Sequence, residues 1–134
     1  MSKNIILLFL VALAASQQGS LQVMPTTTTL FTASTYTFSY YTMHPMPSNA
    51  TITLDFTNTY IEVPNATMNA TGAIQGAQVS GVTAVCASLI CTLKMNNAVN
   101  QLRNMSITFG LLKNPYFKNK QTISSQVQFN NSYT

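Results

Sequence analysis

The stretch Thr35-Tyr-Thr-Phe-Ser-Tyr-Tyr41 alternates between two kinds of side chain. Tyr36, Phe38 and Tyr40 are aromatic, and the residues between them carry hydroxyl groups. Successive side chains of a β-strand point to opposite faces, so this alternation predicts a strand with an aromatic face in the core and a hydroxyl face outside. Strands also favour aromatic residues and threonine.

Three other stretches alternate in the same way. Their inward residues are predicted to be Ile52, Leu54 and Phe56 within Thr51–Phe56, Ile107, Phe109 and Leu111 within Ser106–Leu111, and Ile123, Ser125, Val127 and Phe129 within Ile123–Phe129. Shorter strands are predicted at Leu21–Met24, Thr29–Phe31, Tyr60–Val63, Val82–Cys86 and Cys91–Met95. The small-residue stretch that holds Gly72, Gly76 and Gly81 predicts a loop, and Asn97–Arg103 is the best candidate for a short helix.

Turn-forming residues separate these strands, at His44–Asn49, Pro64-Asn65, Asn96-Asn97 and Asn114-Pro115. Many short strands between frequent turns predict an all-β chain, a single antiparallel β-sandwich. The chain has no Trp and its two Cys are close together, so it lacks the Cys…Trp…Cys spacing of a true immunoglobulin domain. We therefore expect an immunoglobulin-like sandwich in the broad sense, one domain over residues 17–134.

Residues 1–16 read as a secretory signal peptide. Lys3 supplies the positive charge, Ile5–Ala15 is an apolar run of the right length, and Ala12, Ala14 and Ser16 offer small residues for cleavage. The alternative is an uncleaved membrane anchor, but a spanning helix needs ~20 apolar residues. We expect a secreted chain with no membrane span after cleavage, and the C-terminal end has no hydrophobic tail of the kind a GPI signal requires.

Charged residues make up 6% of the chain, against ~25% in an average protein. After loss of the leader, five basic and two acidic side chains give a net charge of +3. Only Lys113, Lys118 and Lys120 lie close together, whereas nucleic-acid binders cluster many basic side chains. No nucleic-acid partner is therefore expected.

The mature chain contains five Asn-x-Ser/Thr glycosylation motifs, none with Pro in the middle position. Their acceptors are Asn49, Asn65, Asn69, Asn104 and Asn130. Chance alone would supply a couple of them in a chain so rich in Asn, Ser and Thr, but the leader makes glycosylation an expectation for at least two. Each motif also predicts exposure, and glycans would provide solubility that the few charges do not.

Cys86 and Cys91 are the only cysteines. An even number of cysteines in an oxidising compartment predicts a disulfide, here one that closes a tight hairpin or bulge. The alternatives are a reduced pair or a redox or metal pair. A redox or metal pair usually appears as Cys-x-x-Cys with further ligands, which are absent.

The order of the segments resembles a known family. Leu21-Gln-Val-Met-Pro-Thr-Thr-Thr-Thr-Leu30 leads into the Thr35 strand, Met46-Pro-Ser-Asn49 precedes Ala50–Phe56, and Met105–Pro115 follows the cysteines. This order resembles the β-sandwich modules repeated in tandem in very large surface or secreted proteins of ciliate-type protists. The resemblance implies an extracellular structural or adhesive role and offers no catalytic residues. This chain departs from the family by holding one copy and by stopping soon after the last strand, as a single-domain relative or a fragment of a longer protein would.

The chain has few residues for catalysis. Asp55 and Glu62 are its only acids and would have to face one cleft to act as a glycosidase pair. His44 and Asp55 lack a nucleophile motif that would complete a triad. Exposed, solubilising carboxylates are the simpler interpretation, so we expect no enzyme and no cofactor.

Two other groups of residues have side chains that could bind a ligand. Met43-His44-Pro45-Met46 has thioether and imidazole groups that suit copper, but a Pro turn with buried Met side chains is the simpler interpretation, and no metal site is expected. Tyr41 and Tyr116 are the tyrosines expected to be exposed and available to stack on a sugar. The sequence thus predicts a secreted structural or adhesive glycoprotein. Its partner is expected to be an extracellular protein or glycan, or a second copy of the chain bound through a sheet edge. A soluble carbohydrate- or small-ligand-binding module is the alternative.

Overall fold

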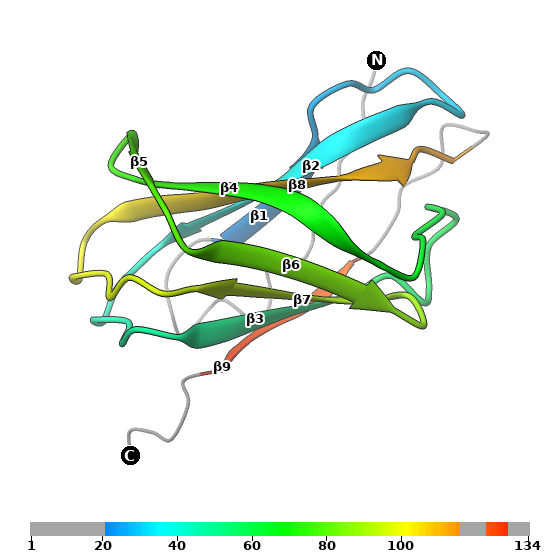
Figure 1. Cartoon of the computed structure of the whole chain (residues 1–134). Coiled ribbons are helices and arrows are strands. Elements are labelled where there is room, and N and C mark those ends of the chain that lie inside the picture. The colour runs from blue at the N-terminus through cyan, green and yellow to red at the C-terminus, as the bar shows by residue number, and fades with distance from the viewer. Residues whose placement is uncertain (1–20, 116–122, 129–134) are drawn as a thin grey trace.

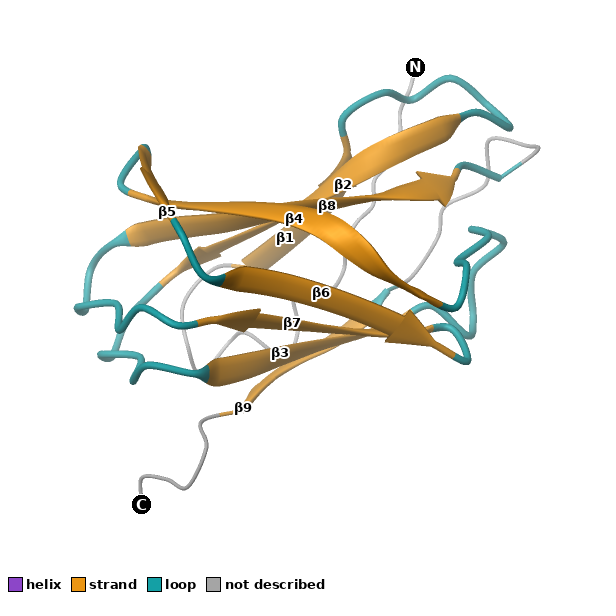
Figure 2. Cartoon of the chain, viewed as in Figure 1, coloured by secondary structure: helices purple, strands orange, loops and turns teal. Residues whose placement is uncertain are grey.

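The computed structural model describes residues 21–115 and 123–128, which form strands, turns and loops without a helix (Figures 1 and 2). The strands are β1 (Leu21–Pro25), β2 (Ala33–Tyr41), β3 (Ala50–Asp55), β4 (Ala66–Ile74), β5 (Ala77–Val79), β6 (Val82–Ala87), β7 (Ile90–Met95), β8 (Asn104–Lys113) and β9 (Ser124–Gln128). All of their pairings are antiparallel. The predicted all-β class is confirmed.

The strands form one sheet in the order β1-β2-β8-β4-β6-β7-β3-β9, with β5 paired to the end of β4. The pairing is nested, because β2 pairs with β8, β3 with β7, and β4 with β6. Strand β4 joins the two halves of the sheet: Ala66–Met68 pair with β6, whereas Asn69–Ile74 pair with β8. The sheet therefore curls, with β1, β2, β8 and β4 above and β6, β7, β3 and β9 below in Figure 1.

One hydrophobic core lies inside the curled sheet and takes side chains from both halves. The predicted inward residues Tyr36, Phe38 and Tyr40 of β2 are all buried, as are Ile52 and Leu54 of β3. Alternation within these strands was thus predicted correctly.

Phe56, which follows β3, brings the two halves together. Its side chain is fully buried, as predicted, and its ring meets that of Tyr36 edge-on at a centroid distance of 6.2 Å. Aromatic pairs in this geometry contribute about 0.5–1.5 kcal/mol beyond the area they bury. The contact links the end of β3 to β2, which lies in the other half of the sheet.

The alternation of β8 breaks at Gly110. Ile107 and Phe109 are buried as predicted, but the prediction that Leu111 points inward is wrong: Leu111 is 57% exposed and Leu112 is buried. The register between β2 and β8 shifts here, so that Gly110 and Leu111 occupy the space opposite one β2 residue. An extra residue of this kind is a β-bulge, and it moves every later side chain to the other face.

Several predicted elements differ from the structure. Strands β4 and β5 replace the loop predicted around Gly72 and Gly76. Thr29–Phe31 forms no strand, Tyr60–Val63 contributes only an isolated bridge, and Asn97–Arg103 forms turns and a bridge instead of a helix. At β4 and β5, pairing with neighbouring strands outweighed local propensity.

The last strand was predicted at Ile123–Phe129 and is found as β9, which pairs with β3. Ile123 is buried as expected. Phe129 lies outside the described residues, as do the proposed leader and Asn130.

Candidate functional site

The most highly constrained local structure is the hairpin between β6 and β7. Ala87 pairs with Ile90, so the turn consists of Ser88 and Leu89 alone, with φ values of 53° and 68°. Two-residue hairpin turns with two positive φ angles favour Asn and Gly, because a Cβ is unfavourable there. This turn therefore depends on its surroundings for its conformation.

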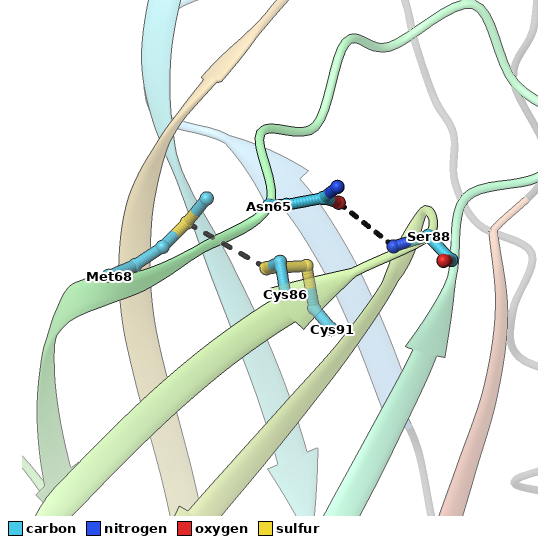
Figure 3. Close-up of a disulfide and its surroundings, with 5 residues drawn as sticks. All are labelled: Asn65, Met68, Cys86, Ser88 and Cys91. Carbon is cyan, nitrogen blue, oxygen red and sulfur yellow. Dashed lines mark hydrogen bonds between the residues drawn. A yellow bond between two sulfur atoms is a disulfide. The ribbon is translucent and has the colours of Figure 1, made fainter.

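Three contacts hold the turn, and Figure 3 shows two of them, the Asn65–Ser88 hydrogen bond and the disulfide. The Ser88 backbone N–H donates to the Asn65 side-chain oxygen at 2.9 Å, and the Leu89 carbonyl accepts from the Phe56 backbone N–H at 2.8 Å. Directly behind the turn, Cys86 and Cys91 face each other across the two strands with their Cα atoms 4.0 Å apart. The hairpin is thus pinned on both sides by the chain that precedes β4.

Cys86 and Cys91 form the predicted disulfide. Both are buried, and the Cys86 sulfur lies 3.8 Å from the thioether sulfur of Met68 on the neighbouring strand β4. Because the sequence has no other cysteine, this bond leaves no thiol for a nucleophile or a metal ligand. Its role in the structure is to brace the hairpin.

The described glycosylation acceptors Asn49, Asn65, Asn69 and Asn104 are all exposed. Asn49 precedes β3 and Asn65 precedes β4, whereas Asn69 lies on β4 and Asn104 begins β8. The Asn65 side chain accepts its hydrogen bond through oxygen, so the amide nitrogen, which takes a glycan, is not part of that bond. Exposure is the condition that glycan attachment requires.

The two acids have separate neighbours. An Asp55 carboxylate oxygen accepts from the Thr57 backbone N–H at 2.9 Å, which shapes the turn after β3. Glu62 exchanges two backbone hydrogen bonds of 3.0 Å with Lys113 at the end of β8. Asp55 thus stabilises the turn after β3, and the backbone of Glu62 pairs with the end of β8.

The Met43–Met46 segment divides between surface and core. Met46 is buried and exchanges backbone hydrogen bonds with Val99, whereas Met43 and His44 are exposed. Among the described residues, no group of three or more His, Cys, Asp or Glu side chains is close enough to hold a metal ion. The segment acts here as the loop between β2 and β3, tied to the loop before β8.

The tyrosines divide into core and surface residues. Burial raises the pKa of Tyr40 to about 12 and raises that of Tyr36 further. Tyr41 is half-buried, whereas Tyr60 is 63% exposed. Of the two tyrosines predicted to be exposed, Tyr116 lies outside the described residues.

The buried Asn114 was not predicted from the sequence. Its side-chain oxygen accepts from the Tyr36 hydroxyl at 2.7 Å, and its amide group donates to the carbonyl oxygens of Thr27 and Thr29 at 2.9 and 2.8 Å. In the sequence, Asn114-Pro115 reads only as a turn, and no pattern marks its side chain as the anchor of the loop between β1 and β2.

The described residues include no helix of the length and apolar character needed to cross a membrane. No protein-family model, curated protein or solved structure matches the chain. The resemblance to tandem β-sandwich modules therefore stays a prediction.

Proposed function

We propose that this chain is a secreted glycoprotein, a structural or adhesive module of a cell surface or extracellular matrix, and not an enzyme. The observation that carries the proposal is the exposure of every described glycosylation acceptor on a domain braced by a buried disulfide. Disulfides persist in oxidising compartments, and glycan acceptors must be accessible. Both features fit the signal peptide proposed at residues 1–16.

We further propose that the curled sheet is an immunoglobulin-like β-sandwich in the broad sense. The shared core and the contact between Phe56 and Tyr36 support two facing layers. Such a domain presents surfaces and edges for recognition, and edges β1 and β9 each pair with one strand among those described. Self-association or recognition of another extracellular protein or glycan is then the mode of action.

The intact mass of the chain secreted from a eukaryotic host tests this proposal. We expect a mature chain that begins near Gln17, loses mass on removal of N-glycans and shows no free thiol after alkylation. An unprocessed, unglycosylated chain would refute the proposal.

A carbohydrate- or small-ligand-binding module is the second candidate. The exposed aromatic side chains of Tyr60 and Phe31 favour it, because sugars stack on such rings. The Lys113 ammonium lies over the Phe31 ring, 3.8 Å from its centre, so a sugar would stack on the other face of that ring. A glycan-array signal that Tyr60→Ala or Phe31→Ala abolishes would support this function. No binding to any glycan would remove it.

A further inference from the structure

The outer surface of β6, β7 and β3 is a regular grid of nine side chains. Register places them in three rows, which we call the β6–β7–β3 face. The rows are Thr83, Lys94 and Thr51; Val85, Thr92 and Thr53; and Ala87, Ile90 and Asp55. All nine are partly or fully exposed, whereas the residues between them along each strand are partly or fully buried.

This face differs from an ordinary solvated surface. Val85 and Ile90 are 46% and 38% exposed, and four of the nine residues are threonines. The four described glycosylation acceptors lie outside the nine positions.

The face carries one positive and one negative side chain, at separate positions. Lys94 lies opposite Thr51, four residues along β3 from Asp55. At about 3.3 Å per residue the two charges are roughly 13 Å apart along the strands, too far to pair within one chain. Each charge is therefore available to a partner that carries the opposite charge at the matching distance.

A second copy of the same face has the required pattern. Consider a two-fold axis in the plane of the face, midway between Lys94 and Asp55 and perpendicular to the line that joins them. Rotation about this axis places Lys94 of each copy over Asp55 of the other. With strands about 4.8 Å apart, the same rotation brings Val85 within roughly 4 Å, measured in the plane, of Ile90 in the second copy. Two-fold interfaces are self-complementary in this way.

We propose that the β6–β7–β3 face binds a second copy of this chain, with Lys94 of each copy against Asp55 of the other and Val85 beside Ile90. The inference rests on the proposed adhesive function and specifies its self-association. It specifies a route other than the sheet edges β1 and β9, which the substitutions below leave unchanged.

Charge reversal on each side, followed by mixing, tests the interface. The glycosylated, secreted chain is examined by sedimentation velocity over a range of concentrations. Lys94→Asp and Asp55→Lys, each alone, place like charges together at both ends of the interface, and we expect the dimer dissociation constant to rise about tenfold or more. An equimolar mixture of the two variants should recover the dimer, since each substituted position then faces an opposite charge.

Matched controls separate this effect from misfolding. Asp55→Ser keeps an oxygen that can accept from the Thr57 N–H and removes the charge without creating an Asn-x-Thr motif, so it should weaken the dimer while leaving the urea midpoint nearly unchanged. Gln78→Asp, an exposed position on β5 outside the grid and outside every glycosylation motif, should leave the dimer intact.

Three results would overturn the inference. The first is a chain that stays monomeric at the highest concentration reached. The second is a dimer whose dissociation constant neither charge reversal changes, as pairing through a sheet edge predicts. The third is an equimolar mixture of the two variants that does not form the dimer. In all three cases the intact-mass result decides separately whether the chain is a secreted glycoprotein.

Discussion

A single amide side chain, that of Asn114, joins three separate parts of the chain. It binds the Tyr36 hydroxyl in the core and two backbone carbonyls of the β1–β2 loop. A buried polar group that loses its partner costs about 1–3 kcal/mol, more than the net value of the hydrogen bond itself. Much of the order of this loop therefore depends on one residue.

We expect Asn114→Ala to lower the free energy of unfolding by about 2–4 kcal/mol, because it leaves the Tyr36 hydroxyl without a partner. Urea unfolding measures the change. Asn58→Ala, at an exposed turn position, should stay within about 0.5 kcal/mol of the parent protein. Equal effects of the two substitutions would contradict the role given to Asn114.

The buried tyrosines make stability depend on alkaline pH. An unfolded tyrosine ionises near pH 10, whereas burial raises the pKa of Tyr40 to about 12 and that of Tyr36 further. Between these values the unfolded chain has lost protons that the folded chain keeps, so stability is constant below pH 10 and falls as the pH rises above it.

Urea midpoints on either side of pH 10, read with tyrosinate absorbance, test this expectation. Tyr36→Phe should make the loss less steep. A midpoint that does not move with pH would show that the two hydroxyls ionise freely in the folded state.

The positions that sequence alone misplaced have local steric causes. Alternation predicts Leu111 inside, but the backbone of β2 approaches Gly110 so closely that a Cβ there would lie 2.9 Å from the Thr35 Cα. Because of the bulge at this contact, Leu112 is buried in the core and Leu111 is exposed. Nothing in a single sequence reveals which glycine faces another strand at close range.

At the scale of elements, the β6–β7 hairpin combines an unfavourable turn with strong external support. We expect the double substitution Ser88→Asn and Leu89→Gly to raise the free energy of unfolding by about 1 kcal/mol, since both residues suit positive φ. Ala87→Gly, in the strand next to the turn, should instead lower it by about 0.5–1 kcal/mol. Chemical denaturation of the parent and the two variants under oxidising conditions measures these changes. A double variant less stable than the parent would contradict the claim that the turn is unfavourable for Ser88 and Leu89.

The disulfide encloses only a short loop, so its contribution is modest. With four residues between the cysteines, the chain-entropy relation gives about 2 kcal/mol. We expect Cys86→Ala with Cys91→Ala to keep the fold and lose about this amount in urea unfolding. A reducing agent should then destabilise the parent and leave the variant unchanged.

Element prediction succeeded where a strand has one apolar and one polar face. Strands β2 and β3 alternate clearly, and their buried faces were assigned correctly, whereas β6 and β7 were predicted only as short strands. Strand β4 was missed because it is built from small residues. A Cβ on Gly72 would lie 2.7 Å from a Val82 methyl group, so the position requires glycine. Glycine in a sequence favours the prediction of a loop, which is why the strand was missed.

At the scale of the whole molecule, the scarcity of charge is the dominant property. Only eight of 134 residues are charged, and the exposed surface is mostly amide, hydroxyl and apolar. We expect that enzymatic removal of the N-glycans from the folded, secreted chain sharply lowers its solubility. Light scattering against concentration compares it with the glycosylated parent, and equal solubility would refute a solubilising role for the glycans.

Pairing between distant strands could not be derived from periodicity. Alternation predicts which face of a strand is buried but not which strand lies beside it, and β4 belongs to both halves of the sheet. The disulfide between Cys86 and Cys91 was the one pairing of side chains that the sequence predicted, because the chain has only two cysteines. The candidate docking face depends on strand register, so it too required the structure.

The nested order of the strands has a consequence for biosynthesis. The hydroxyl groups of Thr37 and Thr108, which meet at 2.9 Å on β2 and β8, are 71 residues apart in the chain. Ribosomes add about 5–20 residues per second, so β2 waits roughly 4–14 s for its partner. The nearer pairs β6–β7 and β4–β6 are complete earlier. During this interval the aromatic face of β2 is a substrate for chaperones, and the rate of synthesis becomes a determinant of yield.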